Sequence, residues 1–169
     1  MPHSIVMALF HEASAAAAAA KDLRTLGIPR ERVSIVARTH DEEGALARAS
    51  GASPGSEIED SRPASRLGEL AAHLAAAVAV VIPGVGPIVA DGPLAAALGE
   101  AAGHAIGDIS RALQHAGLEA GEAARWEKRI EGGAFLVGAH VDRPPIETAR
   151  DVLLRNGGSP VAVGTWSDS

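Results

Sequence analysis

The sequence predicts an α+β fold: a ferredoxin-like, four-stranded antiparallel sheet built from two β-α-β halves, with an inserted helical hairpin rich in alanine and glycine. Two observations lead to this prediction. Both ends of the chain show the same order of elements, namely an apolar strand, a helix that closes on leucine, arginine and glycine, and a second strand. The region between them differs in composition. Two such halves commonly form one antiparallel sheet with both helices on one face.

The first half covers residues 1–39. Residues 4–10, SIVMALF, are an apolar run rich in strand-forming side chains. The alanine-rich segment that follows is strongly helical, and Gly27 with Pro29 just beyond it is a typical helix end. Residues 32–38, RVSIVAR, predict the second strand.

The second half covers residues 133–169 and repeats this order. GAFLVGAHV, residues 133–141, predicts a strand. The next helix is expected to open at Asp142 as its cap and to close at Gly157. SPVAVGTW, residues 159–166, predicts the last strand.

The insertion begins with residues 40–63, which are acidic and rich in glycine, serine and proline and predict a flexible linker. Residues 64–132 are assigned to a helical hairpin and a connecting helix. The first hairpin helix is expected over residues 64–82, which are mostly Ala, Leu and Val. The composition of the next segment, PGVGP, predicts the hairpin turn at Pro83, Gly84, Gly86 and Pro87.

The second hairpin helix is expected to start near Pro93, with Asp91 as its cap, and to run to His115, just before Gly117. A shorter helix, EAGEAARWEKRIEGG, then leads back to the sheet.

Glycines recur at every fourth position of the second hairpin helix, at Gly99, Gly103 and Gly107. Such a stripe lets another backbone approach closely, and we predict that it packs helices together, including helices of different subunits. Insertion of this hairpin into a membrane is the alternative. It is disfavoured because Glu100 and Asp108 would be buried in lipid at a cost of at least a few kcal/mol.

A polar stripe accompanies the glycines. It consists of residues spaced by four on both hairpin helices, and across an antiparallel pair they can converge: Glu69, His73, Glu100, His104 and Asp108. Carboxylates and imidazoles on facing helices can hold a divalent metal, although this spacing is not that of the known helical metal motifs. We expect a solvated or polar seam and no cofactor, with a metal site as the alternative.

The remaining histidines fall at strand ends. His11 and His40 end two parallel strands and therefore share one edge of the predicted topology, whereas His140 lies at the other edge near His3. A polar strand end is the expected role of each.

Three segments resemble a family of bacterial general-stress and low-temperature-induced proteins, the YflT-like, heat-induced stress protein group. These are ALFHEASAAAAAAKDLRTLGIPRERVSIVAR, IPGVGPIVADGPLAAALGEAAG and GGAFLVGAH. The resemblance implies a stress-associated role. It implies no reaction and no catalytic residues.

The composition and the motifs of the sequence also argue against several classes of function. The net charge of -6 and an aromatic content of 2% are poorly suited to nucleic acid, which is bound by basic patches and stacking rings. No cysteine is present, and the amino terminus shows no secretory signal, so we expect a cytoplasmic protein with inner-membrane association as an option. Neither a nucleophile elbow nor a phosphate loop occurs.

We therefore expect a non-enzymatic, stress-associated oligomeric or scaffolding protein that associates with itself through the glycine-striped hairpin and the face of the sheet. A membrane-associated protein and a metal- or small-ligand-binding protein are the alternatives.

Overall fold

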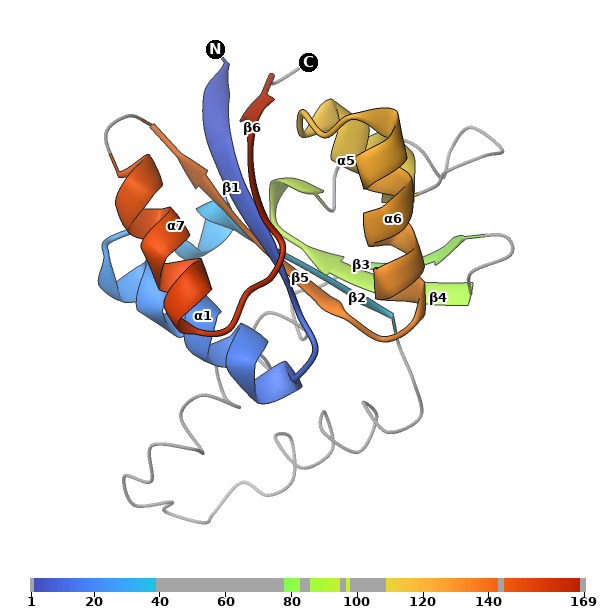
Figure 1. Ribbon diagram of the computed structural model, residues 1–169, viewed down its shortest axis with the longest axis horizontal. Helices are drawn as coiled ribbons and strands as arrows, with labels where there is room; N and C mark the ends of the chain where they lie inside the picture. Colours follow the sequence, from blue (N-terminus) through green and yellow to red (C-terminus); the bar gives the residue numbers. More distant parts are fainter. Residues whose placement is uncertain are drawn as a thin grey trace.

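The fold is centred on one antiparallel sheet whose strands differ in length. The computed structural model describes residues 2–38, 78–82, 86–94, 97, 109–142 and 145–167. Six strands pair in the order β3-β4-β2-β5-β1-β6 (Figure 1). Their bounds are β1 His3–Phe10, β2 Val33–Arg38, β3 Val78–Ile82, β4 Gly86–Asp91, β5 Phe135–Val141 and β6 Val161–Trp166.

The four strands of the two terminal halves are neighbours in this sheet. β5 lies between β1 and β2, and β1 lies between β5 and β6, so the two halves interlock. Each of these pairings is antiparallel, with Ile5 opposite His140 and His3 opposite Trp166. The predicted α+β class and the predicted antiparallel sheet of these four strands are confirmed.

One face of the sheet is covered by α1 (Ala13–Thr25) and α7 (Ile146–Arg155) (Figure 1). The alanine run of α1 is buried against the sheet, and its small side chains allow the helix to lie close to the strands. Phe10 and Leu23 fill the space between helix and sheet, and α7 adds Val152 and Leu153 to the same core cluster. Burying each large apolar side chain contributes about 1.5–3 kcal/mol.

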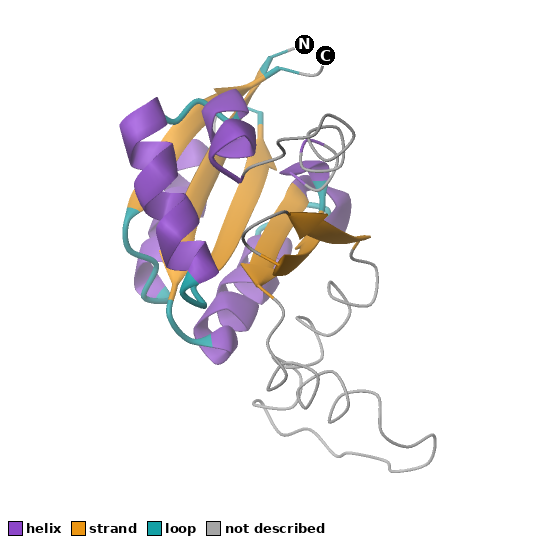
Figure 2. Cartoon of the chain, turned by 90° about the vertical axis from the view of Figure 1, so that its right-hand side faces the viewer, coloured by secondary structure: helices purple, strands orange, loops and turns teal. Residues whose placement is uncertain are grey.

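The opposite face is covered by α5 (Ile109–His115) and α6 (Ala120–Glu131), so helices flank the sheet on both sides (Figure 2). Trp126 of α6 and Leu113 of α5 pack into one cluster with Met7 of the sheet. The Glu127 carboxylate accepts a hydrogen bond from the backbone amide of Ser110 at 2.5 Å, which links α6 to the first turn of α5. The expectation that this sheet face is exposed for association is wrong, because the chain's own helices occupy it.

The insertion differs most from its prediction. Val78–Ile82 and Gly86–Asp91 are strands, not parts of two helices, and they pair antiparallel with Ile82 opposite Gly86. The reversal of the chain falls at the predicted position, but it joins strands. Gly86 and Pro87 belong to β4, at the start of a strand, where proline is tolerated. Pro83 and Gly84 lie outside the described residues.

The physical reason is side-chain branching. β-Branched residues dominate VAVVI, and such side chains lose rotamer freedom in a helix but pack well on a pleated sheet. Because β4 also pairs with β2, the sheet has six strands where four are predicted.

The rest of the predicted hairpin region agrees with the structure in part. Pro93, Leu94 and Ala97 are helical, and α5 covers the end of the predicted second helix, while Asp91 belongs to β4 and is not a helix cap. α6 corresponds to the predicted shorter helix. Gly117 adopts φ +97° after α5, a conformation that favours glycine. Within the described ranges, no helix combines the length and the apolar character needed to cross a lipid bilayer.

Candidate functional site at the histidine end of the sheet

Polar side chains gather at the end of the sheet where β1 begins and β5 and β6 end. We call His3, Ser34, His140 and Trp166 the histidine cluster. They come from the four neighbouring strands β1, β2, β5 and β6. His3 lies directly opposite Trp166, whereas His140 lies opposite Ile5 and Ser34 opposite Gly138. Alternate residues of a strand face the same side of a sheet. His140 lies opposite Ile5 of the α5–α6 core, so the cluster continues that core toward the sheet end.

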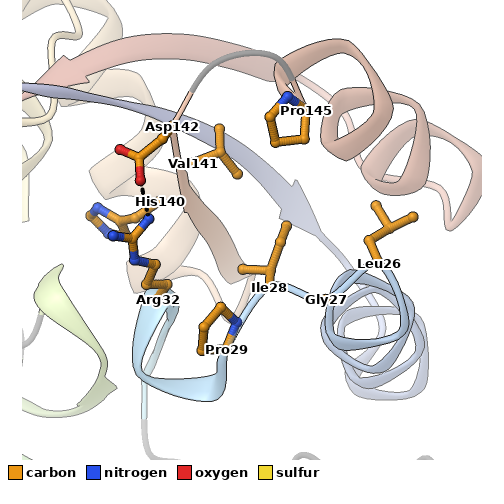
Figure 3. Close-up of a pocket in the computed structure, with 9 residues that line it drawn as sticks. All are labelled: Leu26, Gly27, Ile28, Pro29, Arg32, His140, Val141, Asp142 and Pro145. Atoms are coloured by element: carbon orange, nitrogen blue, oxygen red, sulfur yellow. Dashed lines mark hydrogen bonds and ion pairs between the residues drawn. The ribbon is translucent and has the colours of Figure 1, made fainter.

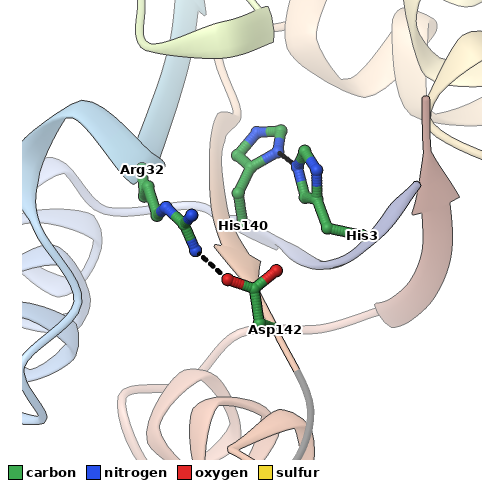
Figure 4. Close-up of polar contacts among 4 residues, drawn as sticks. All are labelled: His3, Arg32, His140 and Asp142. Carbon is green, nitrogen blue, oxygen red and sulfur yellow. Dashed lines mark hydrogen bonds and ion pairs between the residues drawn. The ribbon is translucent and has the colours of Figure 1, made fainter. Parts of the chain in front are cut away.

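His3 and His140 are in direct contact. The Nε2 atom of His3 lies 2.8 Å from the Nδ1 atom of His140, a hydrogen-bond distance (Figure 4). His140 is 1% exposed, whereas His3 at the start of β1 is partly exposed. The sequence prediction that these two residues lie near each other is confirmed, but His140 is a buried group rather than a solvated strand end.

Ser34 holds the other side of the His140 ring. Its Oγ atom lies 3.1 Å from Nε2 of His140 and accepts a hydrogen bond from the backbone amide of Leu94 at 3.2 Å. Ser34 is fully buried, so these partners replace the water that its hydroxyl would otherwise need. The segment that leaves β4 also packs closely against β2. Gly92 of this segment lies so near the backbone of Ser34 that a Cβ atom at position 92 would overlap it.

Trp166 closes the cluster on the β6 side. Its ring stands edge-on to His140, with ring centroids 5.1 Å apart, and edge-on to His115 of α5 at 4.7 Å. Both are favourable aromatic geometries. The Nε2 atom of His115 also lies 3.1 Å from the carbonyl oxygen of Ser167. The indole therefore separates the buried imidazole from an imidazole at the surface.

An exposed ion pair stands beside the cluster. Nη1 of Arg32 donates a hydrogen bond to Oδ2 of Asp142 at 2.6 Å (Figure 4). This hydrogen bond, followed by the charge of Arg32 and then that of His3, holds the pKa of Asp142 below its ordinary value. The Arg32 side chain is 47% exposed and the Asp142 side chain is 66% exposed, so water and salt screen the ion pair.

A shallow cavity of about 210 Å³ lies next to the ion pair (Figure 3). Its walls are mostly apolar, and Arg32 and Asp142 supply its charged edge. The lining residues are Leu26, Gly27, Ile28, Pro29, Arg32, His140, Val141, Asp142 and Pro145.

The remaining candidate residues are His11, His40 and the two stripes of the insertion. His11 is exposed beyond the far end of β1. The glycine stripe of Gly99, Gly103 and Gly107 lies outside the described residues. So does the polar stripe of Glu69, His73, Glu100, His104 and Asp108, and so does His40. Among the residues that the structure does describe, no three His, Asp or Glu side chains are grouped so as to hold a metal ion.

Sequence reasoning missed Ser34, Trp166 and the Arg32–Asp142 pair. Ser34 carries one recognisable signal, since it is the single hydroxyl residue within the apolar strand VSIVAR. The partners of the other three depend on strand register and could not be found from local sequence.

No protein-family model, no curated protein and no solved structure matches the chain.

Proposed function

We propose that this chain is a non-enzymatic, stress-associated protein of the cytoplasm that acts as an oligomer or scaffold by binding further copies of itself. The proposal assigns the contact between copies to the glycine-striped segment at Gly99, Gly103 and Gly107. The sequence resemblance to the YflT-like stress proteins supports the stress-associated role.

The observation that carries this proposal is the coverage of the sheet. α1 and α7 cover one face and α5 and α6 cover the other, and both core clusters are composed of buried apolar side chains. A surface for association must therefore come from outside these layers. The glycine-striped segment precedes α5 directly in the chain and has the small-residue spacing that favours close helix packing.

We further propose that the four strands β2, β5, β1 and β6 correspond to a ferredoxin-like unit of two interleaved β-α-β halves. Three features support this classification. The two strands of each half are not adjacent in the sheet, the position between them is occupied by a strand of the other half, and the helices of both halves belong to one core cluster. β3 and β4 then extend this unit at the β2 edge.

Gly103→Leu tests the proposed contact. A leucine where another backbone approaches costs about 1–3 kcal/mol through overpacking, so we expect light scattering of the full chain to show a smaller assembly. Gly121→Leu is the matched control. Gly121 lies in α6, where a Cβ atom would make only an ordinary contact, 3.8 Å from the end of the flexible Arg125 side chain, and its replacement should leave the assembly unchanged.

The same measurement can contradict the proposal. A parent chain that is monomeric at all concentrations would exclude self-association, and a Gly103→Leu chain as large as the parent would exclude the glycine contact. A parent that stays in solution only with detergent would favour the membrane alternative. Assembly that depends on added zinc and on His104 would favour the metal alternative.

A further inference from the structure

We propose that β6 is the contact strand of a symmetric dimer, in which its outer edge pairs antiparallel with β6 of a second copy of the chain and joins the two sheets into one. This contact is separate from the glycine-striped contact proposed above, and neither of the two requires the other. It rests on the position of β6 in the sheet, on the direction of its backbone groups and on its side chains.

β6 is the last strand of the sheet on the β1 side (Figure 1). Among the described residues it pairs with β1 alone. Val163 is 49% exposed and Thr165 is exposed as well, so the helices that cover the two faces of the sheet do not enclose this edge. The outer edge of β6 is therefore accessible to another strand.

The pairing with β1 determines which backbone groups of β6 point outward. In an antiparallel pair, residues that exchange hydrogen bonds with the partner strand alternate with residues whose N–H and C=O groups point away from it. Immediately before β6, the amide of Leu9 donates a hydrogen bond to the carbonyl oxygen of Pro160. Counted along the register from this bonded pair, the residues that direct their backbone groups outward are Val161, Val163 and Thr165.

These three residues are arranged symmetrically about Val163. An antiparallel copy of β6 centred there places Val163 opposite Val163 of the partner subunit, and Val161 opposite Thr165 of the partner subunit. Each opposite pair can exchange backbone hydrogen bonds in both directions. A single register thus satisfies the outward groups of both strands.

The side chains of β6 favour the same pairing. All three outward-paired residues are β-branched, a type that packs well across neighbouring strands. Natural edge strands are protected from pairing by charged side chains, prolines or bulges. The sequence of β6, VAVGTW, contains no charged residue and no proline. Pairing would also cover Val163, whose large apolar side chain is otherwise half exposed.

The charges of α7 fit this symmetry. α7 packs against β1 and β6 and carries Glu147 in its first turn and Arg155 in its last turn. A two-fold axis perpendicular to the joined sheet runs the two copies of α7 antiparallel on the same face, so the acidic end of each helix lies on the side of the basic end of the other. Complementary charges of this kind favour one partner and one register. We therefore assign the edge to a second copy of the chain.

Val163→Lys tests the contact in the full chain. The substitution places two like charges opposite each other at the centre of the pair, and lysine on an edge strand hinders pairing. We expect light scattering to show about a twofold fall in molar mass, as when one two-fold contact of an assembly opens. Leu26→Lys is the matched control, because Leu26 is 42% exposed at the end of α1, beside the cavity next to β5, and it should keep the parent's molar mass.

The outcomes separate this contact from the glycine-striped one. A smaller Val163→Lys assembly together with an unchanged Gly103→Leu assembly would support the β6 contact and exclude only the glycine contact. A Val163→Lys chain as large as the parent would overturn the β6 contact, whatever Gly103→Leu shows. A parent that is monomeric at all concentrations would overturn both.

Cysteine substitutions test the register without adding charge, and they decide the question if Val163→Lys fails to fold. The chain contains no cysteine, so the thiol of Val163→Cys can form a disulfide only with a second copy. Directly opposite residues in this register have Cα atoms about 5.5 Å apart, a distance that a disulfide can bridge. We expect mild oxidation to convert most of the Val163→Cys chain into a covalent dimer.

Val161→Cys is the control for the register. Its two copies would lie four residues apart along the paired strands, about 13 Å, which a disulfide cannot span. It should cross-link poorly alone and efficiently when mixed with Thr165→Cys. A Val163→Cys chain that cross-links no faster than Leu26→Cys would refute the proposed pairing.

Discussion

The side-chain oxygen of Ser34 accepts a hydrogen bond from the backbone amide of Leu94, a residue sixty positions later in the chain. The oxygen and nitrogen atoms lie 3.2 Å apart. This bond connects β2 to the segment that leaves β4. The same oxygen faces His140, so one buried hydroxyl joins the terminal halves to the insertion.

Ser34→Ala should destabilise the fold by about 1–3 kcal/mol, the cost of leaving buried polar partners unsatisfied. Both the Leu94 amide and Nε2 of His140 would lose their hydrogen bond to Ser34. Urea unfolding at pH 7.5 measures the effect. Ser4→Ala, at a partly exposed position of β1, is the control and should cost clearly less. Equal losses of stability for both variants would mean that the Ser34 hydrogen bonds contribute little.

Gly164→Ala should destabilise the chain by about 1–3 kcal/mol or more, because a Cβ atom at this position of β6 would overlap the carbonyl oxygen of Ala116. In Gly121→Ala of α6, the new Cβ atom makes only an ordinary contact, 3.8 Å from the Arg125 side chain, so the change should be neutral or stabilising by up to about 1 kcal/mol, since alanine favours helix. Thermal unfolding of both variants gives the comparison. A stable Gly164→Ala chain would show that the loop after α5 can move away from β6.

Leu113→Ala should cost about 2–5 kcal/mol, as expected for a buried leucine whose loss leaves a cavity. Leu113 of α5 is 1% exposed, whereas Leu154 at the end of α7 is 47% exposed and provides the control. Denaturant unfolding of the two variants measures the difference.

A chain in which residues 64–117 are replaced by a short linker loses the whole of α5 and should not fold. A folded product would show that α6 alone covers its face of the sheet.

Asp142→Asn should have an effect that depends on pH. The pKa of Asp142 is lowered in the folded state, chiefly by the hydrogen bond from Arg32, so its carboxylate contributes stability above the ordinary Asp range, and this contribution is lost as the pH falls through the lowered pKa. The parent and the variant should differ at pH 6 and converge in strong acid. Asp151→Asn, an exposed carboxylate on α7, is the control for the loss of surface charge. A difference that persists unchanged in acid would assign the effect to packing.

The terminal halves could be predicted because local signals agree with tertiary placement. β1, β2, β5 and β6 are apolar runs bounded by glycine, proline or polar residues, and the predicted bounds lie close to the observed ones. The nearness of His3 and His140 followed from antiparallel pairing alone.

The insertion could not be predicted as well because two signals compete. An alanine-rich stretch, LAAHLAAA, precedes Val78, and alanine favours helix, whereas the β-branched residues that follow favour a strand. Pairing of β4 with β2 decides the outcome, and that pairing joins residues far apart in the sequence. The roles of Ser34 and Trp166 likewise depend on register, which local sequence does not specify.

The pairing of His3 with Trp166 brings the start of β1 and the end of β6 together at one corner of the sheet, as both views show (Figures 1 and 2). Force applied to these two residues would act across the strands, perpendicular to them. The hydrogen bonds between β1 and β6 would then open one after another, as in a zipper, instead of sharing the load as they would in shear. A molecule stretched between these points should yield at low force and peel first at the corner that contains the two histidines.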